Sequence, residues 1–183
     1  MKRVLVIGCP GSGKSTLARA LAERTGLPLF YLDRMYWNGD KTTVEREVFL
    51  SRLEAALAED AWIIDGNYAS TMERRMAVCD TVLFLDYPTD ICLAGVLARQ
   101  GAARPDMPWV ENVGEEDEAF FAFIREYRER SRPGVLVLLE KYKEKDIHVF
   151  QSRDAADAWL RHILWQTSHH CEWNEQHHYE RSE

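Results

Sequence analysis

The stretch that decides the fold is Val4 to Thr16, which reads VLVIGCPGSGKST. It begins with four apolar residues, a run typical of a strand buried on both faces of a parallel sheet. Residues 8–15 then match the pattern G-x-x-x-x-G-K-[ST] of a phosphate-binding loop (P-loop), and a helix is predicted over 15–24. The flanking strand and helix favour a P-loop over a glycine turn before an ordinary helix.

The residue types of this loop suit a bound triphosphate. Glycines let the backbone curl so that its N–H groups point at one phosphate, and the following helix adds the positive end of its dipole. Lys14 is expected to reach the β- and γ-phosphates, Ser15 to bind Mg²⁺ and Thr16 to bind the α-phosphate. We therefore expect ATP and Mg²⁺ as cofactors. The predicted nucleotide-binding residues of the loop are Gly8, Pro10, Gly11, Ser12, Gly13, Lys14, Ser15 and Thr16.

Strands alternate with helices along the rest of the chain. Further strands are predicted at 29–32, 62–64, 81–85 and 146–150. Helices are predicted over 43–58, 89–99, 118–129, 134–143 and 153–165, with a short one after residue 70. Capping residues are predicted to begin three of them: Thr42 with Glu45, Ser70 with Glu73, and Thr89. This alternation predicts a three-layer α/β P-loop NTPase fold, a five-stranded parallel sheet flanked by helices, with ligands beyond the carboxyl ends of the strands.

The length of 183 residues allows one sizeable core and is too short for two ordinary domains. We predict one domain over residues 1–166. Within it, residues 101–117 are rich in Gly, Pro and acidic residues and are predicted to form a short lid. Residues 167–183 lack aliphatic side chains and are crowded with His, Glu and Gln, so a flexible, His-rich tail is expected.

Composition excludes several classes of partner. The formal net charge of -7 argues against nucleic acid, whose phosphate backbone binds basic surfaces. No segment approaches the roughly 20 apolar residues of a membrane span. The four cysteines, at positions 9, 79, 92 and 171, show no C-x-x-C spacing and fit a reducing compartment. We expect a cytoplasmic monomer or homodimer.

Two aspartates follow apolar strands, and either one would supply the carboxylate that a magnesium-bound nucleotide needs near Ser15. Asp65 ends the strand at 62–64, and Asp86 ends the strand at 81–85. The pattern of residues alone leaves both open.

The P-loop, followed later by a strand ending in Asp65-Gly66, resembles the adenylate kinase superfamily of small-molecule kinases. More narrowly, the chain is similar over residues 1–165 to the adenylate-kinase-like proteins often labelled topology modulation proteins. The motifs that carry this likeness are Leu32-Asp33 with Tyr36-Trp37, Asp65-Gly66-Asn67-Tyr68 and Arg104-Pro105-Asp106-Met107. The resemblance implies that the third strand lies beside the first and that Asp65 holds the magnesium waters. It also implies that the loop after the fifth strand lines the adenine, which adds Ser152 and Arg153 to the predicted nucleotide-binding residues.

The acceptor side departs from the adenylate kinase pattern. Those enzymes continue Asp-Gly with Phe-Pro-Arg, whose arginine holds the acceptor phosphate, whereas this chain continues with Asn67-Tyr68. In shikimate-type kinases a carboxylate after the second strand orients the acceptor hydroxyl, and Asp33 is expected to do the same. The alternative is a helix-capping or solvated pair of Asp33 with Arg34. The identity of the acceptor stays open.

Arginines near the predicted lid match the charge that develops in phosphoryl transfer, which spreads over the equatorial oxygens. Arg99 and Arg104 are expected to close onto the nucleotide. Arg74 and Arg75, just beyond Asp65, are interpreted as solvated surface residues. Three aromatic residues either stack on an aromatic acceptor or wall the cleft: Tyr36, Trp37 and Tyr68.

Two functions fit these patterns. The first is an ATP-dependent phosphotransferase, a small-molecule or nucleoside-monophosphate-type kinase. Its predicted catalytic residues are Lys14, Asp33, Arg99 and Arg104, and its predicted metal ligands are Ser15 and Asp65. The second is a nucleotide-binding regulatory ATPase that acts through a protein partner. It is motivated by the missing Phe-Pro-Arg arginine and by the label carried by similar sequences.

Overall fold

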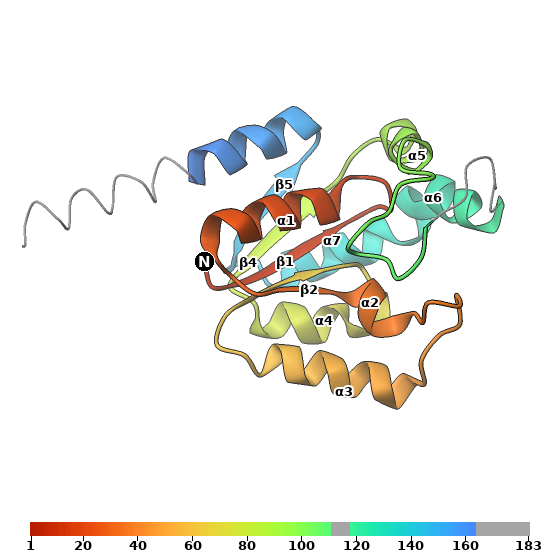
Figure 1. The fold of residues 1–183 in the computed structure, drawn as a ribbon. Coiled ribbons are helices and arrows are strands. Elements are labelled where there is room, and N and C mark those ends of the chain that lie inside the picture. Colours follow the sequence, from red (N-terminus) through yellow and green to blue (C-terminus); the bar gives the residue numbers. More distant parts are fainter. Residues whose placement is uncertain (111–117, 164–183) are drawn as a thin grey trace, which may run out of the picture.

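A five-stranded, all-parallel sheet forms the centre of the molecule (Figure 1). The structure is a computed structural model that describes residues 1–110 and 118–163. The strands are β1 (Arg3–Gly8), β2 (Leu29–Tyr31), β3 (Trp62–Asp65), β4 (Thr81–Leu85) and β5 (Asp146–Phe150). Their order across the sheet is β2-β3-β1-β4-β5, so the third strand does lie beside the first. All five strands were predicted, and β1 is hydrogen-bonded on both sides.

Helices cover both faces of this sheet (Figure 1). They are α1 (Lys14–Thr25), α2 (Leu32–Tyr36), α3 (Arg46–Leu57), α4 (Ala69–Val78), α5 (Thr89–Leu97), α6 (Glu118–Arg130) and α7 (Arg132–Lys141). A further helix begins at residue 153 and is described as far as 163. No helix in the described ranges is both long enough and apolar enough to cross a membrane.

Alternate side chains of β1 enter two different cores, as the pleat of a strand requires. Val4 and Val6 pack with α1, α5, α6 and the helix from residue 153, whereas Leu5 and Ile7 pack with α3, α4 and α7. All four side chains have no exposed surface. The three layers are therefore helices, sheet and helices, which confirms the predicted fold class. The carboxyl end of β1 is followed directly by the loop that leads into the N-terminus of α1.

The three predicted helix caps are wrong. Thr42 lies in a turn, where its backbone N–H and its hydroxyl both donate to Asp40 Oδ1 at 3.0 and 2.6 Å. No side chain caps α3, α4 or α5. Ser70 and Thr89 lie inside the helices that they were expected to precede. Local residue preference predicts a cap, but the tertiary contacts of the preceding loop decide where each helix begins.

Two further differences concern loops. The five-residue helix α2 was not predicted; it begins directly after β2 and brings Asp33 into its first turn. Of the predicted lid, residues 101–110 are irregular apart from turns, and residues 111–117 lie outside the described part of the chain. The predicted tail, 167–183, also lies outside it.

Candidate active site

The P-loop joins β1 to α1 at the carboxyl edge of the sheet. Gly11 and Gly13 have φ angles of 81° and 93°, in the left-handed region that favours glycine. A Cβ atom on Gly11 would lie 1.9 Å from the carbonyl oxygen of Cys92 in α5. The loop therefore needs glycine both for its curl and for its contact with α5.

Two polar side chains of the loop are positioned to bind an anion. The Ser12 residue is 1% exposed, and its hydroxyl has no hydrogen-bond partner among the described residues. Lys14 Nζ donates to the carbonyl oxygen of Cys9 at 3.0 Å, so the ammonium group lies over the loop itself. An unpaired buried hydroxyl and an ammonium group beside a helix N-terminus fit a phosphate group.

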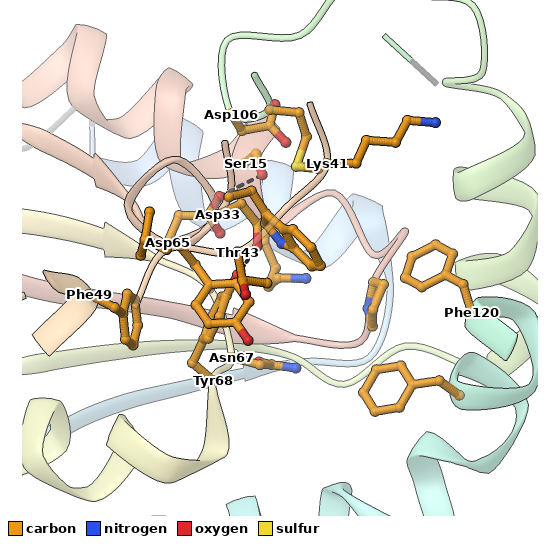
Figure 2. Close-up of a pocket in the computed structure, with 18 of the residues that line it drawn as sticks. Ser15, Asp33, Lys41, Thr43, Phe49, Asp65, Asn67, Tyr68, Asp106 and Phe120 are labelled. Carbon is orange, nitrogen blue, oxygen red and sulfur yellow. Dashed lines mark hydrogen bonds between the residues drawn. The ribbon is translucent and has the colours of Figure 1, made fainter. Parts of the chain in front are cut away.

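Ser15 and Asp65 meet at the end of the loop (Figure 2). Ser15 Oγ donates to Asp65 Oδ2 at 2.5 Å, while Asp65 Oδ1 is buried without a partner in the described structure. Burial raises the pKa of Asp65 to about 6, helped by the nearby charges of Asp33 and Asp106, whereas Lys14 and Ser15 act in the opposite direction. A hydroxyl and an unsatisfied carboxylate oxygen are ligands that suit Mg²⁺.

The structure distinguishes the two candidate aspartates. Asp86 accepts a bidentate pair of hydrogen bonds from Arg132 Nε and Nη2, both at 2.7 Å, and a third from Gln151 Nε2 at 3.1 Å. Asp86 lines neither cavity described below. Its oxygens are committed to this ion pair, and Asp65 is the carboxylate beside Ser15.

Two cavities adjoin the P-loop. The larger, of about 1360 Å³, is lined by Lys14, Ser15, Asp33 and Asp65 and continues toward α3 and α4. The smaller, of about 390 Å³, lies between the P-loop, α5 and the helix that starts at residue 153. Arg99 and Arg104 border both cavities, so the two predicted lid arginines lie where the cavities meet.

The predicted adenine loop contributes one residue to the smaller cavity. Arg153 lines it beside Gly95 and Asp157. Ser152 does not line it; instead its Oγ accepts a hydrogen bond from the Ala155 N–H at 3.2 Å and so caps the helix that follows. The rest of this cavity is lined by residues 11–16, by residues of the neighbouring helices, and by Leu85, Tyr87, Arg104 and Asp106.

Asp33 lies in the wall of the larger cavity and accepts a hydrogen bond from the Tyr68 hydroxyl at 2.7 Å on Oδ1 (Figure 2). Its second oxygen, Oδ2, accepts no hydrogen bond from residues 1–110 and 118–163. Burial, and then the Asp33 charge, raises the pKa of Tyr68, so the phenol stays protonated as a donor. Arg34 donates to the Pro105 carbonyl at 2.8 Å.

The lid arginines have partners in the described structure. Arg104 pairs with Asp106 at 3.1 Å, and Asp106, which is 3% exposed, also pairs with Arg19 of α1 at 3.4 Å. The guanidinium of Arg99 lies 5.9 Å from the ring centre of Phe120 in α6. Asp106 thereby connects the start of the predicted lid segment to α1.

Aromatic side chains wall the larger cavity and contact one another. Tyr36 packs edge-on against Phe49 and Tyr68, with ring centres 5.4 and 5.1 Å apart, and Trp37 packs against Trp109 at 5.6 Å. The predicted aromatic set therefore walls this cavity, and sequence reasoning missed Phe49 and Trp109. Both occur in otherwise ordinary apolar or loop contexts, which carry no local signal for a binding site.

Two further expectations are changed by the structure. Arg75 is not a surface residue: it is fully buried in α4, whereas Arg74 is exposed and pairs with Glu54 at 2.8 Å. Helical spacing held a signal for this, because Arg75 shares the buried face of α4 with Thr71, Met72 and Met76. Gly8 does not offer its N–H to a phosphate, because Asn67 Oδ1 accepts that N–H at 2.9 Å. Asn67 had been given no role.

Comparisons with known proteins agree with this geometry. A family model described as "ATPase family associated with various cellular activities (AAA)" matches residues 4–86. The chain is 27% identical over 172 residues to an adenylate kinase from Mycolicibacterium paratuberculosis (strain ATCC BAA-968 / K-10), covering 78% of this chain and 87% of that protein.

Solved structures of shikimate kinases are also similar. The enzyme from Bacteroides thetaiotaomicron covers 91% of this chain and 98% of its own, at 19% identity and a TM-score of 0.54. The enzyme from Aquifex aeolicus covers 92% and 98%, at 17% identity and a TM-score of 0.49. The fold is that of P-loop proteins with a five-stranded parallel sheet. Within that class, the chain is similar in sequence to an adenylate kinase.

Proposed function

We propose that this protein is an ATP-dependent phosphotransferase that transfers the γ-phosphoryl group of ATP to a hydroxyl group of a small molecule. The observation that carries the proposal is that Lys14 of the P-loop and Asp33 of α2 line one cavity. A triphosphate on the loop and an acceptor at Asp33 would meet inside it. The adenylate kinase relative supports phosphoryl transfer from ATP, but not the choice of a hydroxyl group as acceptor.

The nucleotide half of the reaction would use the P-loop and the smaller cavity. Lys14 would exchange its contact with the Cys9 carbonyl for the β- and γ-phosphates, and the unpaired Ser12 hydroxyl would donate to a phosphate oxygen. Ser15 and Asp65 would hold Mg²⁺, which when bound neutralises charge on the β- and γ-phosphates. The adenine would occupy the cavity beside Arg153.

The acceptor half would use Asp33. Its Oδ2 would accept the proton of the acceptor hydroxyl while that oxygen forms a bond to the γ-phosphorus. The bond from the γ-phosphorus to the bridging oxygen breaks, and ADP carries away the electron pair. Tyr68 would hold Asp33 in place through its 2.7 Å hydrogen bond. The aromatic wall formed by Tyr36, Phe49 and Tyr68 would bury an apolar or ring-shaped part of the acceptor.

Arg99 and Arg104 would stabilise the charge that develops during transfer, because they border both cavities. In the present structure Arg104 is held by Asp106 at 3.1 Å. An arginine that turns onto the phosphates would leave Asp106 paired with Arg19, which is 3.4 Å away.

The test is a phosphotransfer assay with ATP·Mg²⁺ across nucleosides, nucleoside monophosphates and small hydroxy acids, with products identified by mass spectrometry. We expect one class to be phosphorylated and Lys14→Ala to abolish both turnover and ATP binding. ATP hydrolysis without a phosphorylated product, together with ATP-dependent capture of a protein partner, would instead favour a regulatory ATPase. If no acceptor reacts and Lys14→Ala binds ATP like the unaltered protein, both functions are wrong.

A further inference from the structure

The side chain of Asn67 is paired with both backbone polar groups of Gly8. Asn67 Oδ1 accepts the Gly8 N–H at 2.9 Å, and Asn67 Nδ2 donates to the Gly8 carbonyl at 2.6 Å. On its other side Gly8 is in register with Leu85 of β4. The ladder between β1 and β3 ends at Val6 and Asp65, apart from one bond from Gly66 N–H to the Val6 carbonyl. The Asn67 amide therefore stands where another strand residue would continue the ladder.

The backbone leaves the sheet here because of the conformation of residues 66–68. Gly66 and Tyr68 have φ angles of 135° and 36°, and Tyr68 is one of two non-glycine residues in the described structure with a positive φ. Such a conformation is costly for tyrosine and persists only where surrounding contacts enforce it. These contacts come from α4.

Arg75 of α4 binds the carbonyl groups of this loop. Its guanidinium donates to the carbonyls of Gly66 at 2.8 Å and Tyr68 at 3.1 Å, and also to that of Asn67. Its Nε donates to the Thr71 carbonyl at 3.3 Å. Arg75 has no exposed surface, and burial lowers its pKa to about 10, so it stays charged at neutral pH.

No carboxylate forms an ion pair with Arg75 in the part of the chain that the structure describes. A buried cation is costly unless polar groups surround it, and here four carbonyl oxygens do so. The loop conformation places carbonyl oxygens where they accept hydrogen bonds from Arg75, and these hydrogen bonds in turn stabilise the loop conformation. Each requires the other.

The segment that Arg75 holds touches three parts of the candidate active site. Asp65 accepts the Ser15 hydroxyl, Asn67 pairs with Gly8, and Tyr68 donates to Asp33. Residues 65–68 thus connect the metal-binding pair, the phosphate-binding loop and the acceptor carboxylate. The guanidinium of Arg75 is directed at the backbone carbonyls of this segment.

We infer that Asn67 is a positioning residue for the phosphate-binding loop and that Arg75 holds Asn67 in place. The inference rests on the proposed function, because the loop must bind ATP and its test uses the KM of the acceptor identified in the phosphotransfer assay. Fixing both polar groups of Gly8 before ATP arrives means that the loop need not be ordered during binding. Loss of the Asn67 amide should therefore weaken ATP binding far more than it weakens binding of the acceptor.

The test compares Asn67→Asp with Asn38→Asp. Aspartate at position 67 still accepts the Gly8 N–H but places an anionic oxygen against the Gly8 carbonyl. Asn38 is exposed and lies outside both cavities, so Asn38→Asp adds the same charge elsewhere. For Asn67→Asp we expect an increase of about tenfold or more in the dissociation constant for ATP·Mg²⁺, measured by calorimetry, with the KM of the acceptor within about twofold. For Asn38→Asp both should change by less than about twofold.

A second pair of variants tests whether Arg75 holds Asn67 in place. Arg75→Met leaves the three loop carbonyls unpaired, so we expect both ATP affinity and the KM of the acceptor to worsen by about tenfold or more, because Asn67 and Tyr68 both move. Arg74→Met, its exposed neighbour, should leave both within about twofold. Amide hydrogen exchange of the unaltered protein is a further test of the inference and needs no variant. The Gly8 N–H should be as protected without nucleotide as the central amides of β1.

The inference is overturned by an unprotected Gly8 amide, by Asn67→Asp that binds ATP as tightly as the unaltered protein, or by ATP and acceptor affinities that fall equally in Asn67→Asp. If Asn67→Asp does not fold, Asn67→Ser, which removes both hydrogen bonds to Gly8 without adding charge, is judged by the same two affinity criteria. Failure of the unaltered protein to bind ATP would overturn the proposed function instead.

Discussion

Ser15 and Asp65 lie 50 positions apart in the chain, and the Ser15 hydroxyl donates to Asp65 Oδ2 at 2.5 Å. The parallel pairing of β1 with β3 creates this relationship, because it ends both strands at the same edge of the sheet. The second oxygen of Asp65 is buried and unpaired among the described residues. Asp65 Oδ1 therefore lacks a hydrogen-bond partner among the described residues, as is expected of a carboxylate oxygen that binds a metal ion.

The first prediction concerns Asp65 and stability. Burial raises the pKa of Asp65 from 3.8 to about 6, so the folded protein takes up a proton that the unfolded chain does not. The free energy of unfolding should fall as pH rises from about 4 to about 6 and then level off. At pH above that window, Asp65→Asn should be more stable than the unaltered protein by on the order of 2 kcal/mol.

Urea unfolding of both proteins below and above this pH window measures the effect. The advantage of Asp65→Asn should be clearly larger above the window. An equal difference at both pH values would contradict the assigned pKa. The same variant should lose the magnesium dependence of ATP binding, since a neutral amide is a poorer ligand than a carboxylate.

The second prediction concerns Asp86, whose pKa shifts the other way. Burial alone would raise it, but the hydrogen bonds from Arg132 and Gln151 and the charges of Arg132 and Arg128 lower the pKa of Asp86 below 3.8. Stability from this ion pair is present above about pH 4 and is lost as pH falls further. Asp86→Asn should lower the free energy of unfolding at pH 7 by roughly 1–3 kcal/mol, because Arg132 is 25% exposed and partly screened.

ATP affinity should be unchanged in Asp86→Asn, which calorimetry with ATP·Mg²⁺ would check. Asp65→Asn and Asp86→Asn thus form a matched pair that separates a functional aspartate from a structural one. A loss of ATP binding in Asp86→Asn without loss of stability would reverse the assignment.

The third prediction concerns the acceptor carboxylate. Asp33→Asn should lower kcat by roughly 10²- to 10⁴-fold, because an amide cannot accept the proton of the hydroxyl. Tyr68→Phe removes only the hydrogen bond to Asp33 and should lower kcat by about tenfold. Steady-state kinetics with the accepted substrate measures both, with the exposed Asp60→Asn as control. A kcat for Asp33→Asn within about twofold of the control would rule out a role for Asp33 as the base.

The fourth prediction concerns the contact of α5 with the P-loop. A Cβ atom on Gly95 would lie 2.0 Å from the Gly11 carbonyl oxygen, so Gly95→Ala must push the loop and the helix apart. We expect a loss of about 1–3 kcal/mol in the free energy of unfolding and weaker ATP binding. Gly134→Ala in α7 is the matched control, because no atom lies within 4 Å of its added Cβ.

The Gly134→Ala control should gain about 0.5–1 kcal/mol from the better helix propensity of alanine. Thermal or urea unfolding of the two variants tests the pair. If the free energy of unfolding changes by the same amount in both variants, the close approach of α5 to the P-loop does not contribute to stability.

Much of this protein was predictable from local pattern. The β1 run and the glycine-rich loop sit side by side in sequence, so strand, P-loop and helix could be expected together, and the structure confirms them. The other four strands are short and, apart from β5, largely apolar, and each stands between segments of helical periodicity. The placement of Lys14, Ser15 and Asp33 at the carboxyl edge followed from the parallel sheet alone.

What only the tertiary structure decided concerns side chains whose partners are distant in sequence. Asp65 and Asp86 look alike as the ends of apolar strands, and they differ because Arg132 reaches one and Ser15 the other. Helical spacing places Arg75 on the buried face of α4, but only the fold shows that carbonyl groups surround its guanidinium. Strands and helices form from contacts among near neighbours, so periodicity reveals them, whereas the burial and charge state of a polar side chain depend on which distant atoms pack around it.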